Sequence, residues 1–177
     1  MARTLNSVGE GLGTGGLRLA VWRTPQLMKL TELLTPSLIK VGIEGTEKEE
    51  VFWEMVQLFV DNALISNREA AVQALLDREA KMTTGISRWL ALPHGKLDEA
   101  KGLLIAMGIS RRGIEYQSLD GQPVYVVLSI FAEAGNPGPY IEALAEVSRL
   151  FSIAGFIEKV RDAGSPEEVL ALIEAQE

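Results

Sequence analysis

The 177-residue sequence contains no cysteine and a single histidine, His94. Without cysteine the chain can form no disulfide, thiolate metal site or cysteine nucleophile, and one histidine excludes a metal site built from several imidazoles. No apolar run approaches the roughly 20 residues of a membrane-spanning helix; the best candidate, 124–132, is typical of a buried strand. We therefore expect no bound metal or other cofactor and no membrane insertion. The absence of an export signal favours a cytoplasmic location.

Positive charge is also scarce. Lysine and arginine number 17 against 24 acidic residues, a net charge of −7, which disfavours DNA or RNA as a partner. Hydrophobic residues make up 47% and charged residues 23% of the chain, a composition typical of a packed domain rather than of a disordered chain. The length suits one such domain.

The first 27 residues differ from the rest. Residues 9–16 include five glycines and match G-x-G-x-x-G, but no buried strand precedes them, as a dinucleotide-binding turn requires. Such composition is typical of a flexible linker. The apolar stretch 17–22 is short and interrupted by Arg18, unlike a signal peptide. We therefore expect residues 1–27 to be a flexible extension and residues 28–177 to be the folded domain.

Helix and strand patterns alternate within the expected domain. Capping residues predict helices that begin near Thr46 with Glu49, Asn67 and Ser165, and apolar spacing predicts two more over 140–151 and 156–163. Apolar or alternating runs predict strands at 38–43, 89–92, 101–109 and 123–132. Because helices are numerous enough to cover both faces of a sheet, the pattern predicts an α/β sandwich.

The single histidine lies in a segment that can carry chemistry. His94 follows Pro93, which fixes φ, and precedes Gly95, which lets another backbone approach closely. We therefore expect its imidazole at the end of a strand. A histidine with a pKa near 6.5 is partly neutral at physiological pH and can hold a phosphoryl group as a phosphoramidate. The alternative is a histidine that only occupies a turn.

Several neighbouring residues supply groups that bind phosphate. The backbone N–H groups of Thr84, Gly85 and Gly95 can hold phosphate oxygens. Thr83 and Thr84 add hydroxyl donors. Arg78, sixteen residues before the histidine, can reach back as a planar charged clamp.

Residues 75–97, LLDREAKMTTGISRWLALPHGKL, resemble the active-site segment of enzyme IIA of the phosphoenolpyruvate:sugar phosphotransferase system, fructose/mannitol type. The motifs that carry the resemblance occur without gaps: Arg78-Glu79, Thr83-Thr84-Gly85 and Pro93-His94-Gly95. The stretch ALPHGKL is most similar to the nitrogen-regulatory branch. The resemblance extends over residues 28–177, a type-2 IIA domain, and implies one mixed β-sheet of about five strands flanked by helices on both faces.

The resemblance also implies a function. It implies that His94 accepts a phosphoryl group from a histidine-containing phosphocarrier protein and that Arg78 orients the phosphorylated histidine. In nitrogen-regulatory members the phosphorylation state sets which regulatory target protein is bound, and we favour this function. The alternatives are a sugar-transporting component that passes the group to a IIB domain, a IIA-like binding module with impaired or no phosphotransfer, and an unrelated α/β enzyme that uses His94 as a base.

Two departures from the family pattern affect the expected site. Ser87-Arg88-Trp89 replaces a G-x-G segment. These side chains either narrow the approach to His94 or add a docking surface; alternatively, Trp89 packs inward and Arg88 is solvated. Tyr140 takes the place of a second histidine of the family. Its hydroxyl can bond an imidazole or a phosphate but cannot carry positive charge; alternatively, Tyr140 is a half-buried aromatic at a helix start.

Overall fold

The computed structural model describes residues 28–133 and 135–177, so the extension expected at 1–27 lies outside these residues. The described part contains two short 3₁₀ turns, six strands and five helices: η1 (Leu30–Glu32), η2 (Pro36–Leu38), β1 (Ile39–Val41), α1 (Lys48–Asp61), α2 (Arg68–Glu79), β2 (Gly85–Ser87), β3 (Leu90–Ala91), β4 (His94–Lys96), β5 (Leu103–Ile114), β6 (Val124–Ala132), α3 (Gly138–Phe151), α4 (Phe156–Asp162) and α5 (Pro166–Glu174). Within these ranges no helix combines the length and the apolarity needed to cross a bilayer.

The six strands form one open mixed sheet in the order β1-β5-β6-β3-β2, and β4 also pairs with β6. The two long central strands, β5 and β6, are antiparallel, whereas β3 and β4 both run parallel to β6. Because β3 pairs near the start of β6 and β4 near its end, the chain follows β6 along its length. This path places His94 opposite Ile130, beside the carboxyl end of β6.

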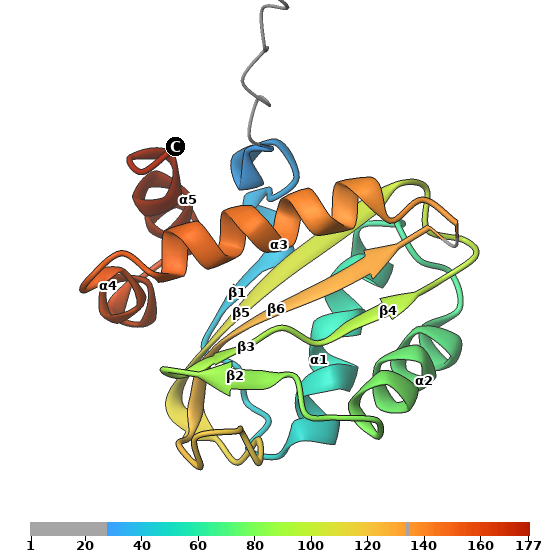
Figure 1. The fold of residues 1–177 in the computed structure, drawn as a ribbon, viewed down its shortest axis with the longest axis horizontal. Helices are drawn as coiled ribbons and strands as arrows, with labels where there is room; N and C mark the ends of the chain where they lie inside the picture. Colours follow the sequence, from blue (N-terminus) through green and yellow to red (C-terminus); the bar gives the residue numbers. More distant parts are fainter. Residues whose placement is uncertain (1–27, 134) are drawn as a thin grey trace, which may run out of the picture.

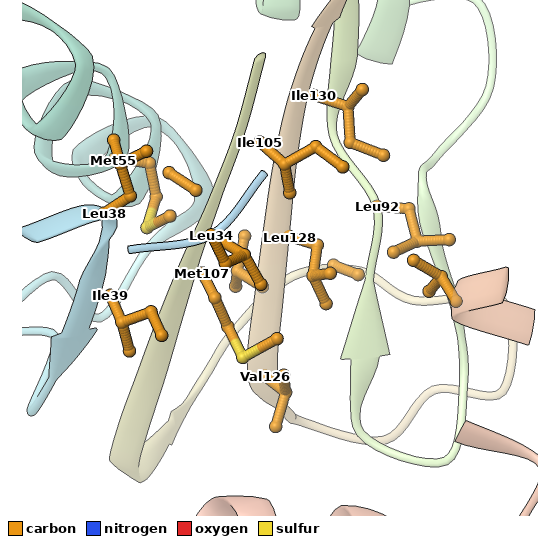
Figure 2. Close-up of a cluster of buried hydrophobic side chains, with 14 of the residues drawn as sticks. Leu34, Leu38, Ile39, Met55, Leu92, Ile105, Met107, Val126, Leu128 and Ile130 are labelled. Atoms are coloured by element: carbon orange, nitrogen blue, oxygen red, sulfur yellow. The ribbon is translucent and has the colours of Figure 1, made fainter. Parts of the chain in front are cut away.

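Helices cover both faces of this sheet, with α1 and α2 on one face and α3, α4 and α5 on the other (Figure 1). Phe59 of α1 packs edge-on against Phe131 of β6, with ring centroids 5.4 Å apart. Alternate residues of β6 point to opposite faces, and nearly every one is buried. Figure 2 shows part of the resulting core, where Met107 and Leu128 of the central strands lie near one another. The predicted sandwich is confirmed, with six strands rather than about five.

Two predicted helix starts are confirmed, and the third lies one residue further on. The side chains of Asn67 and Ser165 each accept a hydrogen bond from the backbone N–H three residues later, at 3.0 and 3.2 Å. Helix α1 is capped by Glu47, which forms the capping box with Glu50. The carbonyl oxygen of an N-cap residue accepts the first hydrogen bond of its helix. Thr46 is not the cap, because its carbonyl oxygen accepts instead from the backbone N–H of Glu115 (2.9 Å).

Candidate functional site

A pocket of about 570 Å³ opens at the carboxyl end of β6. His94, Arg78, Gly95 and Tyr140 line it together, although they come from three different elements. Its wall also carries charged side chains of both signs, namely Lys81, Lys96, Asp77 and Glu133. The structure therefore gathers four of the sequence-predicted site residues around one open space.

The hydrogen-bond partners of His94 define which ring nitrogen carries the proton and which carries the lone pair. Nδ1 lies 2.9 Å from the carbonyl oxygen of Leu92, and Nε2 lies 2.9 Å from Nε of Arg78. A carbonyl oxygen only accepts and a guanidinium only donates, so Nδ1 carries the proton and Nε2 keeps its lone pair. The ring is thus a neutral imidazole whose Nε2 is the nucleophilic nitrogen.

The surroundings of His94 also favour this neutral form. Burial lowers the pKa of His94, and the nearby charge of Arg78 lowers it too; the Leu92 carbonyl and Glu79 act in the opposite direction. The net result is a pKa below the ordinary value of 6.5. This lowering favours the neutral imidazole over the imidazolium at physiological pH.

This lowered pKa predicts that the protein loses stability in mild acid. Below about pH 6.5 the unfolded chain takes up a proton on His94 that the folded chain resists, so the free energy of unfolding decreases as the pH falls from that value toward the lower pKa of the folded state. Urea unfolding measured at intervals between neutral and acid pH tests this. A His94→Gln variant should lack this part of the pH dependence, and identical profiles for the two proteins would contradict the prediction.

Gly95 explains how Arg78 comes to face His94. A Cβ atom on Gly95 would lie 3.1 Å from Cβ of Ala74 and 3.3 Å from its carbonyl carbon, so α2 packs directly on the backbone of β4. Arg78 lies one helical turn beyond Ala74, on the same side of α2. Its guanidinium donates through Nε to His94 and through Nη1 to the carbonyl oxygen of Met82 (3.0 Å).

Tyr140 covers another side of the imidazole. Its ring centroid lies 5.2 Å from that of His94, with the planes tilted by 39°. Tyr140 is half-buried in the first turn of α3. Burial raises the pKa of Tyr140, although the charge of Arg78 lowers it in part. The phenol therefore stays protonated and is neither a base nor a charged partner for a phosphoryl group.

Thr83, Thr84 and Gly85 lie outside the pocket wall, and the N–H groups of Thr84 and Gly85 and both threonine hydroxyls are already bonded within the protein. Both the N–H (2.9 Å) and the hydroxyl of Thr84 donate to the carboxylate of Glu79. The N–H of Gly85 donates to the Thr83 hydroxyl (3.2 Å). A Cβ on Gly85 would lie 2.8 Å from the ring of Tyr116, so this glycine serves close packing. The phosphate cradle predicted from the amides of Thr84 and Gly85 is not formed.

The turn that replaces the family's glycines lies at the other end of β6. Arg88 and Trp89 form the two-residue turn between β2 and β3, with φ of 51° and 70°, a left-handed conformation that costs about 1 kcal/mol or more per non-glycine residue. The half-buried Trp89 ring packs edge-on against Tyr125 (5.2 Å) and beneath the guanidinium of Arg161 (4.8 Å). Arg88 is exposed. Because neither residue lines the His94 pocket, the turn does not narrow the approach to the histidine.

The sequence and the fold agree with a known family of proteins. Residues 32–176 match the family model "Phosphoenolpyruvate-dependent sugar phosphotransferase system, EIIA 2". The chain therefore belongs to this family, which confirms the predicted family membership.

Relatives occur among both regulatory and sugar-specific proteins. The chain is 38% identical over 146 residues to the fructose-specific EIIABC component of Bacillus subtilis, covering 82% of the chain but only 23% of that protein. It is 31% identical over 148 residues to the nitrogen regulatory protein of Bradyrhizobium diazoefficiens, covering 82% of the chain and 96% of that protein. The crystal structure of the nitrogen regulatory protein IIA-Ntr from Neisseria meningitidis superimposes with a TM-score of 0.76 at 25% identity, covering 81% of the chain and 98% of that structure.

Proposed function

We propose that this chain is a phosphocarrier that accepts a phosphoryl group on Nε2 of His94 from a histidine-containing phosphocarrier protein. The observation that carries the proposal is the state of the imidazole: the Leu92 carbonyl holds the Nδ1 proton, and the Nε2 lone pair is directed to Arg78 in an open pocket. Membership of the EIIA 2 family supports the same chemistry. We also propose that the protein acts in the cytoplasm.

The transfer step requires little bond-breaking help from the protein. The Nε2 lone pair attacks phosphorus, the bond from phosphorus to the donor's imidazole breaks, and the donor's nitrogen keeps that electron pair. A phosphoryl group brings close to two negative charges. Because the Nε2 lone pair accepts the Arg78 hydrogen bond, Arg78 must move its Nε donor to an oxygen of the incoming phosphoryl group as the attack begins, while the bond from Nη1 to Met82 keeps the guanidinium beside the site. Lys81 and Lys96 add positive charge at the pocket wall.

We further propose that the phosphorylation state controls the binding of a regulatory target protein. The whole-length match to the Bradyrhizobium nitrogen regulatory protein and the ALPHGKL segment support this function. The second candidate is a sugar-transporting component, supported by the identity to the fructose-specific relative. Incubating the phosphorylated chain with a fructose- or mannitol-type IIB domain distinguishes them, because only a sugar-transporting component should pass the group on rapidly.

Phosphorylation of the wild-type chain is the direct test of the phosphocarrier proposal. With phosphoenolpyruvate, enzyme I and the carrier protein, we expect the intact mass to increase by one phosphoryl group. Peptide mapping should place it on His94, and acid should release it, as expected of a phosphoramidate. If a sugar-specific IIA is labelled in the same mixture and this chain is not, the phosphocarrier proposal is wrong. The chain would then fit the alternative of a IIA-like binding module. Tyr140 supports that alternative, because it cannot supply the positive charge of a second histidine.

A further inference from the structure

A buried polar cluster lies next to the His94 pocket and has no part in the transfer step described above. Its centre is the carboxylate of Glu79, whose side chain is only 7% exposed. Lys48, the first residue of α1, donates to Oε1 (2.7 Å), and Thr84 donates to Oε2 through its N–H (2.9 Å) and its hydroxyl. The Thr84 hydroxyl also lies 2.8 Å from the hydroxyl of the buried Tyr116.

The cluster is connected to Arg78 through the loop that follows α2. Glu79 is the last residue of α2 and Arg78 precedes it. By holding the N–H of Thr84, Glu79 closes the loop 80–84 back onto the end of the helix. This loop contains Met82, whose carbonyl oxygen accepts the second hydrogen bond of Arg78 (3.0 Å). The position of the loop therefore sets the direction in which the guanidinium approaches Nε2 of His94.

The ion pair between Lys48 and Glu79 is better explained by the orientation that it gives the carboxylate than by a gain in stability. Taking a carboxylate and an ammonium out of water costs free energy that their attraction repays only in part, and well-packed apolar residues are often as stable. Burial raises the pKa of Glu79, yet the bonds from Lys48 and the Thr84 and Thr83 hydroxyls outweigh it and keep the carboxyl ionised. The hydrogen bonds from Lys48 and Thr84 hold the Glu79 carboxylate in one orientation. In metal sites, hydrogen-bond partners orient the metal ligands in the same way.

We propose that Glu79, fixed by Lys48, is a positioning residue for phosphoryl transfer: it holds the loop 80–84 and through Met82 aims Arg78 at His94. The proposal rests on the phosphocarrier function proposed above. It also assigns a role to the R-E and T-T-G motifs, which act from behind the pocket wall rather than on the phosphoryl group itself.

The chain offers a matched control in the pair Lys40 and Glu54. These residues are also joined by a short ion pair (2.6 Å), and the Glu54 side chain is 14% exposed. Glu54 likewise accepts hydrogen bonds from backbone N–H groups, those of Glu44 and Gly45, at 3.0 to 3.1 Å. It lies on α1 beside a different cavity and does not line the His94 pocket. The two glutamates thus differ mainly in their connection to Arg78.

The experiment compares Glu79→Gln with Glu54→Gln, since each amide removes the charge but keeps an oxygen acceptor. With the phosphorylated carrier protein as donor, we expect the initial rate of His94 phosphorylation to fall about tenfold in Glu79→Gln, by analogy with the loss of partners that orient metal ligands. Glu54→Gln should keep the wild-type rate. Thr84→Val should also slow the reaction and Thr84→Ser should not, which tests the cluster even if Glu79→Gln fails to fold.

Nitrogen-15 NMR of the single imidazole gives a readout that loss of stability alone would not change. In Glu79→Gln the Nε2 resonance should move downfield, because the lone pair loses its Arg78 donor, while Nδ1 keeps its proton on Leu92. The resonance should not move in Glu54→Gln. Unchanged rates and shifts in Glu79→Gln and Thr84→Val, or equal losses in both glutamate variants, would overturn the positioning role. If the wild-type chain accepts no phosphoryl group, the proposed function fails, and the Nε2 shift still decides the positioning of Arg78.

Discussion

Replacing His94 by glutamine is expected to abolish phosphoryl acceptance while leaving the fold in place. The chain has no cysteine and no second histidine, and an amide nitrogen is not a nucleophile for phosphorus. The phenol of Tyr140 lines the same pocket, but burial raises its pKa and keeps it protonated, so it is not an alternative phosphoryl acceptor. The glutamine oxygen can accept the hydrogen bond from Nε of Arg78 at the place of Nε2, so stability should change by no more than about 1 kcal/mol.

Intact mass after incubation with the complete donor system measures this result. The control is Tyr140→Phe, which keeps the aromatic ring beside the imidazole and should still be phosphorylated. Phosphorylation of His94→Gln at a level comparable to wild type would show that another side chain is the acceptor. It would leave the neutral imidazole of His94 without its proposed role.

The sequence was sufficient to predict where a residue lies when its placement depends on a local pattern. His94 between Pro93 and Gly95 lies at a strand, as expected, and Gly95 permits the close approach of another backbone, that of α2. Arg78 reaches the imidazole from the preceding helix. The helix caps at Asn67 and Ser165 also depend on neighbours in sequence, which is why both are confirmed.

The hydrogen-bond partners of the T-T-G segment, residues 83–85, could not be predicted from the sequence. A sequence indicates that an amide N–H exists but not whether it is free, and the partners of Thr84 come from α2 and from Tyr116, 32 residues away. The ion pair of Lys48 with Glu79 could not be predicted from the sequence either, because the two residues are 31 positions apart. Hydrogen bonds over such separations are decided by how the elements pack, so these residues could be placed only with the structure.

Short strands and strand ends escaped prediction for the same reason. Strands β2 and β4 have three residues each, too few for a periodic pattern, and they form by pairing with β3 and β6. Strand β5 continues to Ile114, past the predicted end at 109 and through Arg111. That arginine donates to the carbonyl oxygens of Arg161 and Ala163 at the end of α4 (2.9 and 2.5 Å). A tertiary contact thus keeps a charged residue in a strand.

Replacing Arg78 by methionine should slow phosphoryl transfer about 100- to 1,000-fold, the usual cost of removing one preorganised donor at a site of developing charge. Methionine removes both the donor to Nε2 and the charge beside the phosphoryl oxygens. The transfer rate of Arg78→Lys should lie between those of Arg78→Met and wild type. An ammonium restores the charge but not the planar group that can bond Met82 and the phosphoryl group at the same time.

The two variants also separate the charge of Arg78 from its geometry through the pH dependence of the rate. The charge of Arg78 lowers the pKa of His94, so in Arg78→Met this pKa should rise and the loss of rate in acid should begin at higher pH. Arg78→Lys should keep the wild-type profile at a lower rate. Initial rates of phosphorylation between about pH 5.5 and 7.5, one unit on either side of the ordinary histidine pKa, measure both effects. Lys81→Met is the control, since Lys81 lines the pocket without bonding His94. If Lys81→Met slowed transfer as much as Arg78→Met, general positive charge at the pocket would be responsible, and the hydrogen bond of Arg78 to the imidazole would have no special part.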